Sequence, residues 1–313
     1  MISLFHIPTH KVDTSIFSNL LHDRIVRQFE ERFADYAGAK YAVSFNSATS
    51  AIFLALHDEF GERVIIPSII PPVVPNAIIN AGSFVDFEDD VEWVGDSYIL
   101  HEWRDCKLID SAQAVRKNQF AKEARPNDLM IFSFYPTKPV SSCDGGMIVS
   151  NDEAAIEKLR ILSMNGMSPE KNSWDQQQGM IGHKMYMNSI QAYIADKNLK
   201  VLDFKKERLA EVREKYNDAF GLKNTSEHLY RVYVADNQQM VEKAKQAGIA
   251  CGIHYQAAHL NKVISDYSER EASPKLLLSE KVARHTLSIP YHGQLSKKEV
   301  DMVIEFFKSK IVI

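Results

Sequence analysis

Short apolar segments alternate with helical or turn-rich segments through the first half of the chain, and this order restricts the fold more than any other feature. An amphipathic helix is predicted from His22 to Tyr36, with Gly38 at the position of a C-terminal cap. The apolar runs that follow are Tyr41–Phe45, Val64–Ile66, Ser83–Phe87, Lys107–Ile109, Leu129–Phe134 and Met147–Ser150. Strands that alternate with helices favour an α/β fold with a mixed, mainly parallel sheet flanked by helices.

The pattern changes in the second half. A helix from about Asn151 to Met164 and a polar stretch, Ser168–Gly179, precede one long helical pattern from about Asn188 to Phe220. After it we expect a strand at His228–Ala235, a helix at Gln238–Ala247, a strand at Ala250–Tyr255 and a last helix opened by the capping box Ser296–Glu299. The chain of 313 residues is long enough for two domains. We predict a large domain, residues 1–205, and a smaller α+β domain, residues 206–313.

Charge and cysteine usage exclude several classes of protein. The 37 Lys and Arg residues against 41 Asp and Glu leave a net charge of −4 with no basic block, which argues against nucleic-acid or membrane partners. The cysteines Cys106, Cys143 and Cys251 are widely spaced and form no CxxC pair, so we expect free thiols and no metal site. A basic signal-peptide start is absent, and the apolar stretch Val64–Gly82 contains four prolines. We therefore expect a cytoplasmic protein, with a loop and a short helix in that stretch.

A polar turn follows the first predicted strand. Asn46-Ser47-Ala48-Thr49-Ser50 lies where a strand ends and a helix begins, and free N–H groups at a helix N-terminus attract phosphate. An ordinary helix cap is the alternative, because Ser, Thr and Asn are the usual capping residues. Neither GxGxxG nor a Walker A pattern accompanies the turn, which argues against nicotinamide and nucleoside triphosphate sites.

Two further side chains stand at strand ends. Asp110 follows the apolar pair Leu108-Ile109, so its carboxylate can hold a cationic ring nitrogen, or can simply form an Asx turn. Lys138 lies between two prolines after the strand that ends near Phe134. A solvated surface lysine is the plain alternative, but a desolvated lysine becomes a Schiff-base nucleophile. A phosphate cradle, a ring-nitrogen carboxylate and a Schiff-base lysine together are what pyridoxal 5′-phosphate requires.

At this point the sequence resembles a known family, the DegT/StrS nucleotide-sugar aminotransferases, which have the type I aspartate aminotransferase fold. The resemblance covers nearly the whole chain, and the lysine block is its most specific part. The turn Asn46–Ser50 is similar to that of members that make 4-amino sugars from UDP-4-keto sugars. The matching segments are residues 29–36, 38–43, 46–51, 110–113, 133–138, 144–146, 182–187 and 254–259.

The resemblance implies a role for each matching residue. Lys138 would form the Schiff base with pyridoxal 5′-phosphate and then move the substrate proton, Asp110 would pair with the ring nitrogen, and Gln113 would bond near the phenolic oxygen. Amino groups would pass from L-glutamate to a nucleotide-linked keto sugar. A homodimer with shared active sites is implied through the segment Lys184–Asn188. The phosphate ligands would be Ala48, Thr49, Ser133 and Lys184, and the substrate-side residues Tyr186, His228, His254, Tyr255 and His259.

Some readings stay open at this stage. Each of the three histidines is as readily a buried structural residue, and no carboxylate or cysteine is spaced to make them a metal site. A sugar dehydratase is disfavoured because dehydratases of this family carry histidine in place of the lysine. A cofactor-binding homologue without turnover is a further alternative, because the chain departs from the family near the substrate. The loop Pro67–Pro72 has no aromatic residue to stack on the cofactor, Ile109 replaces the usual acidic residue before Asp110, and only 24 positions separate Asp86 from Asp110.

Overall fold

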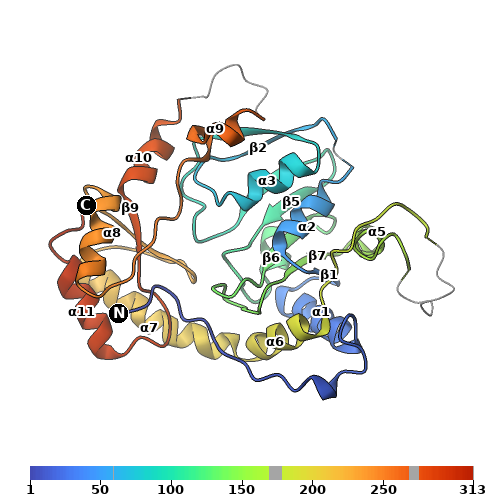
Figure 1. Ribbon diagram of the computed structural model, residues 1–313, viewed down its shortest axis with the longest axis horizontal. Helices are drawn as coiled ribbons and strands as arrows, with labels where there is room; N and C mark the ends of the chain where they lie inside the picture. The colour runs from blue at the N-terminus through green and yellow to red at the C-terminus, as the bar shows by residue number, and fades with distance from the viewer. Residues whose placement is uncertain (59, 169–177, 268–274, 313) are drawn as a thin grey trace.

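A mixed sheet covered by helices on both faces forms the centre of the molecule in the computed structural model (Figure 1). The structure describes residues 1–58, 60–168, 178–267 and 275–312, so most of the polar stretch Ser168–Gly179 lies outside the described residues. The sheet order is β1 (Tyr41–Phe45), β7 (Gly146–Ser150), β6 (Leu129–Ser133), β5 (Lys107–Asp110), β4 (Tyr98–Glu102). The predicted α/β class and the mixed character of the sheet are confirmed.

The expected predominance of parallel strand pairs is wrong for the pairs that the described residues form. Within the five-stranded sheet only β5 and β6 are parallel, and a second parallel pair joins β2 (Arg63–Pro67) to β3 (Phe84–Glu88). The unexpected strand β4 runs antiparallel to β5. Only residues 103–106 connect these two strands. So short a connection permits a hairpin and is too short for the helix that a parallel crossover needs.

Helices on the two faces of the sheet bury separate apolar clusters. The helix α1 (Arg24–Ala37) begins after the capping side chain of Asp23 and ends at Gly38, whose φ of 79° is left-handed. It packs with α6 (Ser189–Lys200) on one face. On the other face lie α2 (Ala48–Ala55), α3 (Val73–Asn80) and α5 (Glu153–Ser163). The short helix predicted within the proline-rich stretch is α3, which begins directly after Pro72.

The long helical pattern is two helices. Its regular course stops at Val201, after which α7 (Leu202–Phe220) continues into the C-terminal part. There β8 (Tyr230–Tyr233) pairs antiparallel with β9 (Thr286–Ile289), and α8 (Asn237–Gln246) and the capping box of α11 (Lys297–Phe307) are confirmed. The remaining helices are α4 (Gln119–Glu123), α9 (Lys262–Ser265), α10 (Leu277–His285) and the 3-10 turns Thr14–Ile16 and Ala258–Leu260.

The strand expected at Ala250–Tyr255 does not form. Gly252 makes an isolated bridge to Ser288, whereas β9 takes the full ladder beside β8. Apolar residues of α7, β8, α8, β9 and α11 share one cluster, which Ile2 from the N-terminal segment joins. The division at residues 205 and 206 stays a prediction. In the part of the chain that the structure describes, none of the helices has the length and apolar character to cross a membrane.

Candidate active site

The N-terminus of α2 faces Gly146, the first residue of β7. Ser47 caps the helix, since its Oγ accepts from the N–H of Ser50 at 3.1 Å, and its carbonyl accepts from the N–H of Ala51 at 3.2 Å. The N–H groups of Ala48 and Thr49 precede this first helical bond and have no acceptor within the helix. Gly146 lies so close that a Cβ there would stand 2.5 Å from the backbone nitrogen of Ala48. This arrangement is a cradle for an anionic group such as phosphate.

Lys138 lies in the turn that follows β6. Its N–H donates to the carbonyl of Tyr135 at 2.8 Å, and the N–H of Tyr135 donates to Oγ of the buried Ser133 at 3.3 Å. Burial lowers the pKa of the Lys138 amine to about 8, although the charge of Asp110 opposes the shift. At neutral pH the amine is therefore deprotonated far more often than that of a solvated lysine, and can act as a nucleophile.

Asp110 ends β5 and is 5% exposed. Its Oδ1 accepts from the N–H of Ala112 at 2.8 Å, and its Oδ2 accepts from the hydroxyl of Tyr98 at 2.9 Å. Burial raises the pKa of Asp110, and these two bonds together with the charge of Lys138 work against that rise. A carboxylate so placed can pair with a cationic group that enters the site.

Gln113 follows three residues after Asp110 and is buried. Its Oε1 accepts from the N–H of Gly95 at 2.9 Å, and its Nε2 donates to the hydroxyl of Tyr255 at 3.0 Å. Gln113 thus ties the segment before β4 to the C-terminal part of the chain.

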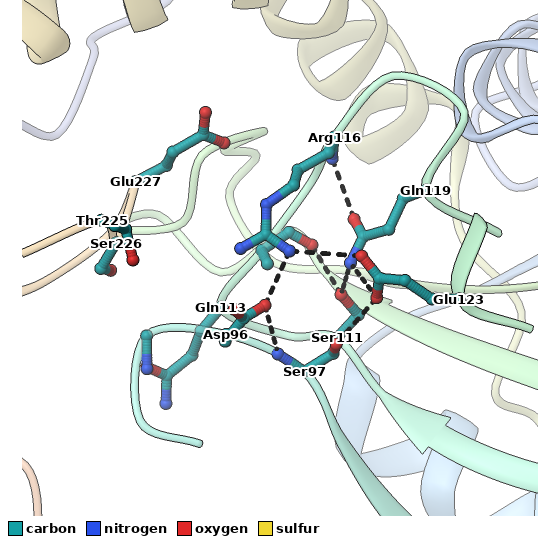
Figure 2. A network of polar contacts seen from close by, with 12 residues as sticks. Asp96, Ser97, Ser111, Gln113, Arg116, Gln119, Glu123, Thr225, Ser226 and Glu227 are labelled. Atoms are coloured by element: carbon teal, nitrogen blue, oxygen red, sulfur yellow. Dashed lines mark hydrogen bonds and ion pairs between the residues drawn. The ribbon is translucent and has the colours of Figure 1, made fainter. Parts of the chain in front are cut away.

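A network of polar side chains holds the turn that carries Gln113 (Figure 2). Arg116 Nη1 donates to Asp96 at 2.7 Å and contacts Glu123 at 3.3 Å. Gln119 Nε2 donates to Oγ of Ser111 at 2.8 Å. The network joins the segment before β4, the turn after β5 and α4, so the residues on either side of Gln113 are fixed.

Two imidazoles of the C-terminal part lie near the Lys138 amine. Nε2 of the buried His228 is 3.5 Å from Lys138 Nζ, and the ring of Phe5 stacks on His228 with centroids 5.6 Å apart. His254 shares a hydrogen bond of 2.9 Å with Ser288. Burial and the charge of Lys138 lower the pKa of His228 well below its usual range and that of His254 to about 4. Both rings are therefore neutral at physiological pH.

The other predicted substrate-side residues divide into two groups. Tyr255 faces Gln113, as described, and its ring lies parallel to that of Trp93 at 6.4 Å. The ring of His259 is 2.6 Å from Ser68 Oγ and 3.8 Å from Glu280, and His259 does not line the cavity beside Lys138. That cavity holds about 150 Å³, and its walls include Phe5, Thr137, Lys205, His228 and His292.

Lys184 and Tyr186 lie in the segment between α5 and α6. Lys184 is exposed and bridges to Met164, whereas Tyr186 bridges to Phe45, the last residue of β1. Neither lines the cavity beside Lys138 in its own chain. The sequence reasoning missed Phe5 and Tyr98, which contact the predicted residues directly. The alternation Tyr-Ile-Leu-His-Glu before a short polar turn was the available signal for the strand that carries Tyr98.

Three features of this α/β scaffold define a pyridoxal phosphate enzyme: a phosphate cradle at a helix N-terminus, a buried carboxylate at a strand end and a lysine with a lowered pKa. The residues present therefore fit that cofactor. The chain belongs to the DegT/DnrJ/EryC1/StrS aminotransferase family, which it matches over residues 12–93 and 105–308. It is therefore a pyridoxal phosphate-dependent sugar aminotransferase by family. The unmatched residues 94–104 contain β4.

Relatives and solved structures agree with this family. The chain is 26% identical over 366 residues to the UDP-4-amino-4,6-dideoxy-N-acetyl-beta-L-altrosamine transaminase of Campylobacter jejuni, covering 97% of this chain and 96% of that protein. It is 25% identical to the GDP-perosamine synthase of Caulobacter vibrioides, covering 94% and 91%. The aminotransferase TlmJ from Streptoalloteichus hindustanus superposes with a TM-score of 0.81 at 20% identity, covering 99% and 98%. The latter likeness shows that the folds are the same.

Proposed function

We propose that the protein transfers an amino group from L-glutamate to a keto carbon of a nucleotide-linked sugar. The observation that carries this proposal is Lys138 itself. It lies in the turn after β6 with its Nζ 3.5 Å from Nε2 of the buried His228, and burial lowers the pKa of its amine to about 8. When bound, pyridoxal 5′-phosphate supplies an electron sink for the substrate carbanion. A lysine at position 138 also favours transamination over the dehydration chemistry of relatives that carry histidine there.

Each residue near the cradle has a defined task in this proposal. Ala48 and Thr49 bind the cofactor phosphate through free N–H groups, and Ser133 adds a hydroxyl. Lys138 holds the cofactor covalently and then, as a free amine, takes a proton from the substrate carbon and returns it to the cofactor side. Asp110 keeps the ring nitrogen protonated, and Gln113 orients the phenolic oxygen.

The substrate enters beside the neutral imidazoles. We assign His228, His254 and Tyr255 to the substrate side. His228 lies 3.5 Å from the Lys138 amine, the ring of Phe5 contacts both His228 and His254, and the ring of Tyr255 contacts that of His254. Neutral rings can accept or donate hydrogen bonds to sugar hydroxyls without adding charge. His259 is assigned a packing role, since it bonds to Ser68 in the loop after β2.

A homodimer with shared sites completes the proposal. Tyr186 bridges to Phe45 at the end of β1, Lys184 bridges to Met164, and neither residue lines the cavity beside Lys138. We assign them to the active site of a partner subunit, where Lys184 would contact the phosphate and Tyr186 the sugar.

The test begins with cofactor spectroscopy. Protein titrated with pyridoxal 5′-phosphate should gain a near-ultraviolet or visible band that Lys138→Ala abolishes, whereas Lys245→Ala, at an exposed lysine of α8, should retain it. L-glutamate should then convert the bound cofactor to its amine form, and one member of a panel of UDP-, GDP- and dTDP-linked keto sugars should convert it back. A protein that binds no cofactor contradicts the proposal, and bound cofactor without conversion by L-glutamate favours a homologue without turnover.

A further inference from the structure

The hairpin formed by β4 and β5 brings a tyrosine to the strand-end carboxylate. Residues 94–104 lie outside the family match, and β4 within them pairs antiparallel with β5. The register places Tyr98 directly opposite Asp110. Residues opposite each other in an antiparallel pair present their side chains on the same face of the sheet. The unmatched segment therefore supplies Asp110 with a neighbour that belongs to this hairpin.

Tyr98 and Asp110 form a direct, buried hydrogen bond. The hydroxyl of Tyr98 donates to Oδ2 of Asp110 at 2.9 Å, and both residues are buried, with 8% and 5% of their surface exposed. The Tyr98 ring lies 4.5 Å from that of Trp93. Trp93 is itself held, because its Nε1 donates to the carbonyl of Ile69 at 3.1 Å. The phenol thus has little freedom to leave the carboxylate.

We propose that Tyr98 is a positioning residue that keeps Asp110 ionised and aimed at the ring nitrogen of the cofactor. This inference rests on the proposed function, in which Asp110 faces that nitrogen. Burial disfavours the charged carboxylate, and an O–H donor favours it, because the donor stabilises the anion more than the neutral acid. The N–H of Ala112 occupies Oδ1, so Tyr98 determines the rotation of the carboxylate plane through Oδ2.

The expected effect concerns the ring nitrogen specifically. Hydrogen bonds to a charged group are stronger than those between neutral groups. Removal of the Tyr98 hydroxyl should therefore weaken the interaction between Asp110 and the ring nitrogen by about tenfold or more. The loss should appear for a cofactor with a ring nitrogen and be small for an analogue in which that nitrogen is replaced by C–H. The measured quantity is the ratio of the two dissociation constants, which cancels a general loosening of the site.

The experiment compares Tyr98→Phe, Asp110→Asn and wild type by titrating apoprotein with pyridoxal 5′-phosphate and with its C–H analogue. Tyr216→Phe is the matched control, because it also removes a buried hydroxyl, one that donates to the carbonyl of Pro290 at 3.0 Å. The preference for the nitrogen-containing cofactor should fall by about tenfold in Tyr98→Phe and at least as far in Asp110→Asn. It should be unchanged in Tyr216→Phe.

Other outcomes separate the inference from the proposed function. If the preference for the nitrogen-containing cofactor falls in Asp110→Asn but stays at the wild-type value in Tyr98→Phe, the inference about Tyr98 is overturned. The proposed function is then unaffected. A preference unaffected by both changes removes Asp110 from the ring nitrogen, and with it the role of Asp110 in the proposed function. If Tyr98→Phe does not fold, 3,5-difluorotyrosine at position 98 keeps the ring and strengthens the donor. The preference should then rise, and an unchanged preference overturns the inference.

Discussion

The amine of Lys138 should lose its proton near pH 8 in the protein without cofactor. Burial lowers the pKa of this amine from 10.5 to about 8, and the negative charge of Asp110 opposes part of that decrease. At pH 7 a group with that pKa is deprotonated about one time in ten, against roughly one in three thousand for an ordinary lysine. Because only the neutral amine is nucleophilic, its reactivity should rise through pH 7–8 and level off by about pH 9.

Competitive reductive methylation between pH 6 and pH 10, resolved by mass spectrometry at Lys138, measures this directly. An exposed lysine such as Lys245 in the same digest reports the reagent concentration. Asp110→Asn removes the negative charge that favours the ammonium form, so it should move the midpoint below that of wild type. Reactivity at Lys138 that still rises steeply at pH 10 would refute the desolvated lysine. A midpoint unmoved by Asp110→Asn would refute the coupling between the two groups.

The remaining predictions concern the cradle and the partner subunit. Gly146→Ala places a Cβ 2.5 Å from the backbone nitrogen of Ala48, so it should weaken cofactor binding and cost about 1–3 kcal/mol of unfolding free energy. Urea titration measures the cost, and Gly179→Ala, where the nearest atom is 3.9 Å away, is the control that should be near neutral. If sites are shared, mixing inactive Lys138→Ala with inactive Lys184→Ala subunits should restore activity, because each mixed dimer holds one site with both lysines intact. Mixtures as inactive as the two variants alone would contradict shared sites.

Local patterns predicted much of the scaffold of the site. The turn at Asn46–Ser50, the strand ends at Asp110 and Ser133 and the proline-flanked Lys138 are each defined within a few residues. Helix periodicity, caps and apolar runs act over the same short range, so α1, α2 and six of the seven strands β1 to β7 could be recognised directly, and only β4 was missed. The break at Val201 was not predicted, because apolar spacing continues across it and only the packing of α6 and α7 separates the two helices.

The sequence by itself determined which groups stand at the ends of strands; the tertiary structure decided which of them meet. Tyr98 faces Asp110 because β4 folds back as a hairpin, and Phe5 covers His228 although more than two hundred residues separate them. His259, similar in sequence context to the site histidines, turns instead to Ser68. These pairings depend on contacts between distant segments, whose cost in chain entropy is offset only when the whole sheet and its two apolar faces assemble together.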